Sequence, residues 1–291
     1  MTGYFAVDKP EGFTSFDVVA KLRGIIGIKK IGHGGTLDPM ATGVLPIFVG
    51  KATKAADILP DQTKRYVATG LLGVKTNTGD VTGEITERRD YYCDTESMRR
   101  AALAFLGKSE QIPPMYSAVR INGKHLYEIA RKGIEVERQP RPVEIFSIDL
   151  LNFNREQGTF CIDVHCTRGT YIRTLIENIA GQLETVATMQ ALRRIKSGPF
   201  DERDCVTITQ LQEAKEAGTL LSLLRPIENA FSDYPQIMLN EKIARQFLNG
   251  VSTASPKHLI ENTPVQVWSD GIFLGLAESR AGKLIKTCQF V

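Results

Sequence analysis

The spacing of apolar residues divides the chain into short strands and amphipathic helices. Period-two alternation and short apolar runs indicate β structure, whereas apolar positions three and four residues apart indicate helices. The pattern predicts β structure over residues 4–7, 44–49, 65–74, 143–153 and 159–166. It predicts helices over residues 18–26, 95–106, 126–132, 171–183 and 207–217. Ser15 has the side chain of an N-cap for the first of these helices.

The order of these elements indicates the fold class. Strands and helices alternate irregularly, without the strand–helix–strand rhythm of a nucleotide-binding sheet. Residues 143–153 and 159–166 are close enough in sequence to pair with each other. We therefore predict an α+β fold, in which helices flank a mixed and mainly antiparallel sheet.

The pattern changes near residue 233. A short helix is expected over residues 241–248, and Asp270-Gly271 between two alternating runs is a strong signal for a two-residue hairpin turn. Ala281-Gly282 predicts a second turn. The chain is therefore expected to consist of a large domain, residues 1–232, and a small β-rich domain, residues 233–291.

Composition narrows the possible partners and the compartment. The formal net charge of +3 permits an RNA partner without requiring one. The five cysteines show no Cys-x-x-Cys spacing and are expected to be reduced thiols. The chain has neither an apolar leader nor an apolar run of 18 residues, so we expect a cytoplasmic protein without a membrane partner.

The densest signal for a functional site lies in residues 32–46, Gly-His-Gly-Gly-Thr-Leu-Asp-Pro-Met-Ala-Thr-Gly-Val-Leu-Pro. An isolated Asp before Pro usually marks a turn. Here Asp38 lies among glycines, which let the backbone approach a ligand closely, and near His33. The segment lacks the Lys-Ser/Thr ending of a phosphate-binding P-loop, which makes that interpretation weak.

This segment resembles the catalytic motif of the TruB family, the synthases that make pseudouridine in the T loop of tRNA. The resemblance runs in the family's order over residues 5 to about 200. It implies the pseudouridine synthase fold, with a tail similar to a PUA-type RNA-binding β-barrel. The other motifs that carry it are Asp8-Lys-Pro-x-Gly12, Lys64-Arg-Tyr66, Gln111–Ala118, Gly123-Lys-x-Leu-Tyr127, Cys166–Arg173 and Leu192-Arg-Arg194.

The resemblance implies an isomerase that converts a uridine at tRNA position 55 to pseudouridine without a cofactor or metal. Asp38 is the implied nucleophile, attacking either C1′ of the ribose or the base. Tyr66 is expected to stack on the target base and to take the proton from C5, the alternative being an ordinary core tyrosine. Arg173, in the first turn of its helix, opposes the helix dipole and is the expected cationic partner of Asp38, the alternative being a solvated surface arginine.

Further residues are expected to contact the RNA. The target base must leave its stack, and His33 is expected to hold the RNA loop once it has done so. Leu192 is the expected apolar wall of the pocket and Tyr171 a support for Arg173, with core packing as the alternative for both. Six cations are expected to contact RNA phosphates, and the alternative for each is a solvated surface charge. They are Lys9, Lys64, Arg65, Arg141, Arg193 and Arg194.

The expected partner is the T arm of tRNA, bound by a monomer. Two other functions stay open at this point. One is a non-catalytic RNA-binding or tRNA-folding chaperone on the same scaffold, and the other is a metal-dependent hydrolase that uses His33 and Asp38. The remaining histidines are scattered and suggest no zinc site; they are His125, His165 and His258.

Overall fold

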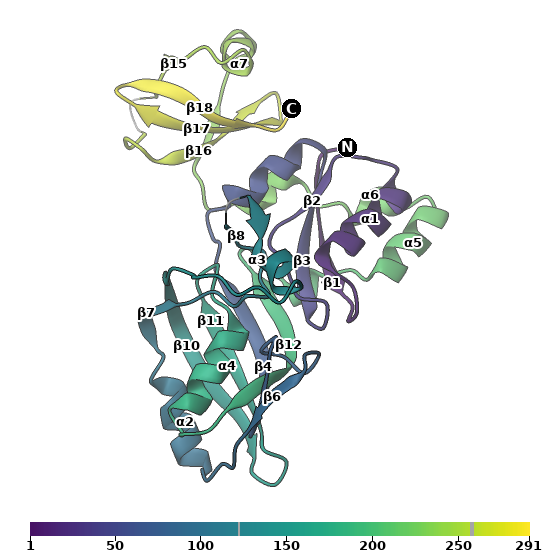
Figure 1. Cartoon of the computed structure of the whole chain (residues 1–291). Coiled ribbons are helices and arrows are strands. Elements are labelled where there is room, and N and C mark those ends of the chain that lie inside the picture. Colours follow the sequence, from purple (N-terminus) through teal and green to yellow (C-terminus); the bar gives the residue numbers. More distant parts are fainter. Residues whose placement is uncertain (122, 257–258) are drawn as a thin grey trace.

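The computed structural model describes residues 1–121, 123–256 and 259–291. A nine-stranded sheet runs through most of the molecule (Figure 1). Its path is β1-β3-β12-β4-β11-β10-β7, with β2 paired to β3 and β13 paired to β12. The strands are β1 (Gly3–Lys9), β2 (Ile31–His33), β3 (Thr42–Val49), β4 (Lys64–Leu72), β7 (Gly107–Gln111), β10 (Arg141–Asn154), β11 (Thr159–Cys166), β12 (Ala187–Ser197) and β13 (Phe200–Asp201).

Helices cover the two halves of this sheet separately. One core packs α2 (Thr95–Leu103) and α4 (Ile172–Gly181) against β4, β10, β11 and β12. A second core packs α1 (Ser15–Ile26) and α5 (Ile208–Glu216) against β1 and β3. Shorter helical segments complete this part of the chain: α6 (Leu220–Leu223) and the 3₁₀ turns η1 (Gly50–Asp57), η2 (Glu202–Asp204) and η3 (Ile227–Phe231).

One parallel contact joins the two halves. β12 pairs in parallel with β3 at only two positions, Arg193 with Thr42 and Arg194 with Gly43. The other neighbours along the path are antiparallel, including β10 with β11 as expected from the sequence. The prediction of a mixed, mainly antiparallel sheet is confirmed. The parallel contact also brings the loop before β3 beside β12.

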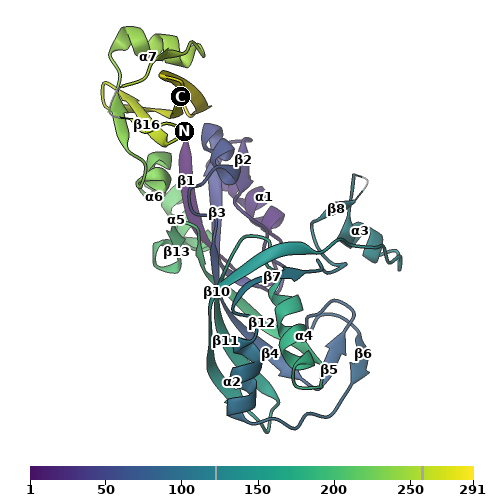
Figure 2. The same cartoon turned by 90° about the vertical axis from the view of Figure 1, so that its left-hand side faces the viewer.

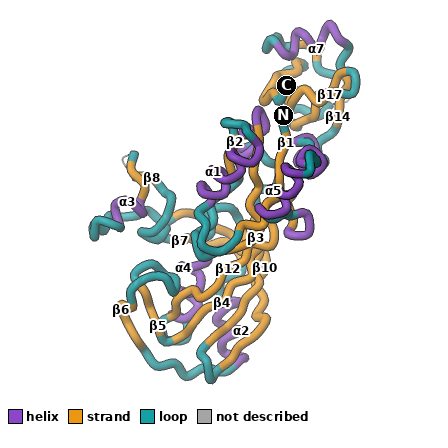
Figure 3. The backbone as a smooth tube through the Cα atoms, turned by 90° about the vertical axis from the view of Figure 1, so that its right-hand side faces the viewer, coloured by secondary structure: helices purple, strands orange, loops and turns teal. Residues whose placement is uncertain are grey.

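A segment between β7 and β10 projects from the body of the molecule (Figures 2 and 3). It contains the strand pair β8 (Arg120–Ile121) and β9 (Lys124–His125), followed by α3 (Leu126–Ala130). A second small pair, β5 (Val74–Thr76) and β6 (Ile85–Arg88), follows β4.

The C-terminal part forms its own five-stranded sheet with the order β14-β16-β17-β18-β15. Asp270 and Gly271 have φ angles of 49° and 75° and close the hairpin between β16 and β17, as predicted. Phe273 and Phe290 share one apolar core with Phe48 and Phe231 of the preceding part. The elements are β14 (Gln236–Met238), α7 (Glu241–Leu248), β15 (Thr253–Ala254), β16 (Pro264–Ser269), β17 (Ile272–Arg280) and β18 (Lys283–Gln289).

The helices predicted from apolar spacing are confirmed, with ends that differ by a few residues. The prediction of Ser15 as N-cap is wrong. Thr14 caps α1, since its side chain accepts from the Asp17 amide and the Asp17 carboxylate accepts from the Thr14 amide. Ser15 is the first helical residue and turns its hydroxyl inward. The central strand β12 has no counterpart among the predicted elements, because register shifts at Met189/Ala191 and Arg194/Lys196 break its alternation.

Candidate active site

Asp38 lies in the loop between β2 and β3. The loop closes with a bond from the Ala41 amide to the Asp38 carbonyl at 3.0 Å. Gly43, with φ of 100°, is the second residue of β3 and lies opposite Arg194 where β3 meets β12. A Cβ atom at Gly43 would lie 2.2 Å from the Arg194 carbonyl oxygen, so only glycine allows this approach.

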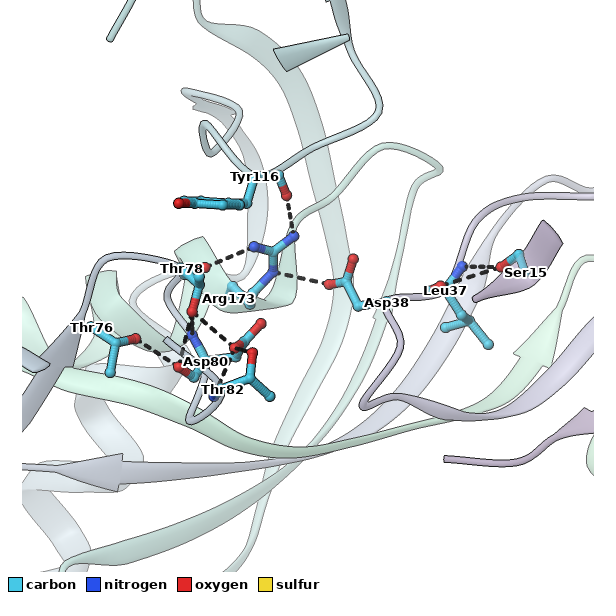
Figure 4. A network of polar contacts seen from close by, with 9 residues as sticks. All are labelled: Ser15, Leu37, Asp38, Thr76, Thr78, Asp80, Thr82, Tyr116 and Arg173. Atoms are coloured by element: carbon cyan, nitrogen blue, oxygen red, sulfur yellow. Dashed lines mark hydrogen bonds and ion pairs between the residues drawn. The ribbon is translucent and has the colours of Figure 1, made fainter. Parts of the chain in front are cut away.

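Arg173 forms an ion pair with Asp38, as the sequence predicts. Arg173 Nε lies 3.0 Å from Asp38 Oδ2 (Figure 4). The other two guanidinium nitrogens donate to the carbonyls of Thr78 and Tyr116, each at 2.7 Å. The Arg173 side chain is only 5% exposed, whereas a third of the Asp38 side chain is open to the pocket. The cation is therefore held rigidly, and one face of the carboxylate is free for a ligand.

The Thr78 carbonyl belongs to a tight polar turn after β5 that the sequence analysis missed. Asp80 accepts from the hydroxyls of Thr78 and Thr82 at 2.9 and 2.5 Å (Figure 4). Thr76 donates its hydroxyl to the Asp80 carbonyl at 2.7 Å. The only sequence signal was the run of Thr, Gly and Asp typical of a turn.

The position of Asp38 beside Arg173, largely away from water, determines the protonation of its carboxyl group. Burial raises the pKa of the Asp38 carboxyl above its usual value, and the nearby Asp80 adds to this rise. Arg173 and, more weakly, Lys9 act in the opposite direction and favour the ionised carboxylate. Asp38 is therefore a poorly solvated carboxylate that depends on Arg173, which suits a nucleophile.

The pair opens into a pocket of about 380 Å³. Tyr66 and Leu192 form buried parts of its wall, and Tyr171 and His33 also line it. Burial raises the pKa of the Tyr66 phenol, so the phenol is neutral near pH 7. Burial and Arg194 lower the pKa of His33, whose buried Nδ1 has no hydrogen-bond partner within the described chain. The pocket thus brings together all three proposed catalytic residues with five of the residues predicted to contact RNA, namely His33, Lys64, Tyr171, Leu192 and Arg194.

Two of the cations predicted to contact phosphates, Lys9 and Arg194, have internal side chains. Lys9 is fully buried, and its ammonium donates to the carbonyls of Pro10, Phe13 and Pro39 at 2.8, 2.6 and 3.1 Å. Arg194 is 1% exposed and donates to the Val44, Gly35 and Thr36 carbonyls. Both cations hold the Asp38 loop, and Arg194 also lines the pocket.

The other cations have different surroundings. Arg65 pairs with Asp163 at 2.8 Å, and Arg193 pairs with both Asp8 and Glu202. Arg141 is exposed at the start of β10. Lys64 lines the pocket and donates to Ser197 Oγ at 2.8 Å; burial and Arg194 lower its pKa to about 7. Arg168, which was not among the predicted contacts, is an exposed cation at the pocket that donates to Gln62 and lies near Asp57.

Within the described ranges, no three His, Cys, Asp or Glu side chains gather as potential metal ligands. His258 lies outside the described residues. The five cysteines are free thiols. Among the described helices, none has the length and apolar character needed to cross a bilayer.

Sequence comparison identifies close relatives of this chain. Residues 23–172 match the model of the TruB family pseudouridylate synthase N-terminal domain, and residues 173–232 match the tRNA pseudouridylate synthase B C-terminal domain. A protein of Clostridium kluyveri named tRNA pseudouridine synthase B is 39% identical over 292 residues, covering 98% of this chain and 99% of that protein. A Lactobacillus acidophilus protein of the same name is 43% identical over 248 residues, covering 83% of each chain.

Comparison with solved structures points to the same family of proteins as the sequence matches. A Cbf5-Nop10-Gar1 complex contains a chain that superposes with a TM-score of 0.75 at 25% identity, covering 99% of this chain and 85% of that one. The likeness confirms the pseudouridine synthase fold with a PUA-like C-terminal sheet. Because the two family models together span most of the chain and the relatives match it nearly end to end, the chain belongs to the TruB family of pseudouridylate synthases.

Proposed function

We propose that the chain converts the uridine at position 55 in the T loop of tRNA to pseudouridine, with Asp38 as the nucleophile. The observation that carries the proposal is the Asp38–Arg173 pair, 3.0 Å apart at the wall of a pocket that also contains Tyr66. The relatives named tRNA pseudouridine synthase B support tRNA as the substrate.

The reaction breaks the bond between N1 and C1′, turns the base and joins C5 to C1′. C5 loses its proton and N1 gains one, so atoms and electrons balance without a redox partner. The Asp38 carboxylate adds to the nucleotide, at C1′ or at the base, and leaves again. Arg173 holds the carboxylate in its ionised form and in place. The target base must be flipped out to reach the pocket.

The surrounding residues have distinct proposed roles. Leu192 and Tyr66 supply apolar and aromatic surface for the flipped base. The neutral Tyr66 phenol favours stacking as its main role, since it accepts a proton from C5 only after losing its own. Tyr171, the residue before α4, supports the helix that carries Arg173. His33 lies at the pocket and is proposed to hold the RNA loop.

The rest of the RNA is proposed to lie on the surface around the pocket. Lys64, Arg65, Arg141 and Arg193 are the remaining candidates for phosphate contacts from the sequence, and Arg168 joins them. We propose that the protein acts as a cytoplasmic monomer on the T arm. The boundary between residues 1–232 and 233–291 is likewise part of the proposal, with the second unit as an additional RNA-binding surface.

The test is tritium release from a T-arm hairpin that carries 5-tritiated uridine, without added metal. Wild type is expected to release tritium, because C5 loses its hydrogen only on joining C1′. Asp38→Asn is expected to bind the hairpin without releasing tritium. If neither protein releases tritium and both bind, the non-catalytic RNA-binding alternative replaces the proposal. Loss of activity on adding a chelator would instead favour the metal-dependent alternative.

A further inference from the structure

The backbone just before Asp38 is held by a side chain from a distant part of the sequence. Ser15, the first residue of α1, is 2% exposed. Its hydroxyl accepts from the Leu37 amide at 2.8 Å and donates to the Leu37 carbonyl at 3.2 Å (Figure 4). Both polar backbone groups of the residue that precedes the nucleophile are thus tied to α1.

The backbone just before Arg173 is held in the same way. Gln111, the last residue of β7, is 5% exposed. Its Oε1 accepts from the Tyr171 amide at 2.9 Å, and its Nε2 donates to the Tyr171 carbonyl at 3.4 Å. Tyr171 is the N-cap position of α4, and its own side chain makes no capping bond. Gln111 therefore anchors the start of the helix that presents Arg173.

The Ser15–Leu37 and Gln111–Tyr171 contacts have the same geometry. Burial of a polar side chain requires only one hydrogen bond, and each of these side chains makes two to the same residue. Each side chain engages both the amide and the carbonyl of a single residue, which restrains that residue in position and in rotation. The restrained residues lie one before Asp38 and two before Arg173. Neither Ser15 nor Gln111 lines the pocket, so neither is placed to contact RNA.

We propose that Ser15 and Gln111 are positioning residues that together fix the distance and orientation of the Asp38 carboxylate relative to the Arg173 guanidinium. The inference rests on the proposed function, in which these two groups work as a pair. It predicts that removing either hydrogen-bonding side chain slows the chemical step and leaves RNA affinity unchanged.

The test variants are Ser15→Ala and Gln111→Met, which remove the hydrogen bonds with little change of volume. Each is expected to lower kcat by about ten- to a hundredfold, the effect of a misplacement on the order of 1 Å. The Kd for the T-arm hairpin should stay within about twofold of wild type, because phosphate contacts set most of the affinity.

The pH dependence separates positioning from general destabilisation. Arg173 and Lys9 lower the pKa of Asp38, while burial and Asp80 raise it. A looser ion pair weakens the lowering effect of Arg173. The acid limb of kcat/KM should therefore move to higher pH in both variants. Carbon-13 NMR titration of the Asp38 carboxyl in the RNA-free protein should show the same upward shift.

Two matched control variants destabilise the same regions but keep the hydrogen bonds to Leu37 and Tyr171. Thr14→Ala removes the cap of α1 next to Ser15. Val143→Ala truncates a buried side chain on β10, which pairs with β7. Each protein is assayed at the same number of degrees below its own Tm. Under these conditions both control variants should keep the wild-type kcat and the wild-type position of the acid limb.

The proposal is overturned if Ser15→Ala and Gln111→Met lose stability like the controls but keep the wild-type acid limb and Asp38 titration. If either variant does not fold, Ser15→Cys and Gln111→Leu replace it with the same expectations. Failure of the proposed function looks different, because wild type would then release no tritium. The NMR titration would still report whether the two side chains hold the ion pair.

Discussion

The Lys9 ammonium lies 3.1 Å from the carbonyl oxygen of Pro39, the residue that follows Asp38. The Gly12 amide donates to the same carbonyl at 2.8 Å. The motif that contains Lys9 and Gly12 therefore acts from inside the protein, by holding the loop of the nucleophile. A lysine in this position looks like an RNA contact in the sequence and is a structural cation in the fold.

Lys9→Met should therefore damage the loop without changing how the protein meets RNA phosphates. Three carbonyls lose a buried donor, which is expected to lower the free energy of unfolding by about 1–3 kcal/mol. Chemical unfolding measures this change. The slope of log Kd against log salt should stay at the wild-type value, because no phosphate contact is lost.

Arg141→Met serves as the comparison, since Arg141 is exposed and proposed to contact RNA. That variant should reduce the salt slope by roughly one unit and leave stability unchanged. A slope reduced in Lys9→Met as well would show that Lys9 reaches the RNA after all.

Arg173→Lys tests whether the charge alone is enough beside Asp38. Lysine keeps the positive charge but has no planar fork to bridge Asp38 and the carbonyls of Thr78 and Tyr116. We expect kcat to fall by about a hundredfold or more, the usual effect of removing a preorganised donor at a reacting group. Single-turnover tritium release with saturating RNA measures this step. A variant with wild-type kcat would show that the guanidinium geometry is unimportant.

The raised pKa of Asp38 predicts how activity and stability depend on pH. Activity needs the carboxylate, so kcat/KM should rise with pH through an apparent pKa above the usual 3.8. Between 3.8 and that pKa the unfolded state ionises first, so Asp38 makes the wild type less stable as pH rises.

Asp38→Asn lacks this titration and should be inactive at every pH. Relative to wild type, its free energy of unfolding should increase across the same window, as urea denaturation at several pH values can show. An acid limb at or below 3.8 would contradict the burial effect.

Gly43→Ala tests the close contact between β3 and β12. Its Cβ would lie 2.2 Å from a backbone oxygen of Arg194, so strands must shift and the Asp38 loop with them. Gly107→Ala is the control, since Gly107 has a similar φ of 94° and open space around it. The control should lose only about 1–2 kcal/mol of stability, from backbone strain. Gly43→Ala should lose clearly more and also lose activity.

The sequence predicted the parts of the site whose signals lie in side chains. Asp38 and Arg173 were identified because the motifs that contain them resemble those of the TruB family. The glycine-rich surroundings of Asp38 and the place of Arg173 in the first turn of a helix, where a cation opposes the helix dipole, agreed with that resemblance. The helices were predictable because each buries one apolar face, and the Asp270-Gly271 hairpin because that turn needs two residues with positive φ.

The rest depends on backbone groups and long-range pairing, which leave little trace in a sequence. The Thr78 and Tyr116 carbonyls that hold Arg173 carry no residue-type signal. Lys9 and Arg194 look like surface cations, because the carbonyls that surround them come from distant segments. β12 was missed because its register shifts disturb the period-two pattern, although it passes through the middle of the sheet.

Lys64→Met should weaken RNA binding in a pH-dependent way. Burial lowers the pKa of Lys64 to about 7, so the amine is charged below pH 7 and neutral above it in the free protein. A bound phosphate favours the charged form, so wild-type affinity should fall as pH rises above 7, while the variant shows no such change. We expect about a tenfold loss in Lys64→Met at pH 6, the contribution of one charge-assisted contact, and less at pH 9. Fluorescence anisotropy with a T-arm hairpin at constant ionic strength measures the affinity at each pH. Arg65→Met is the control, since its effect on affinity should be the same at every pH. Wild-type affinity that is independent of pH would contradict the lowered pKa of Lys64, and wild-type affinity in Lys64→Met at pH 6 would contradict the contact.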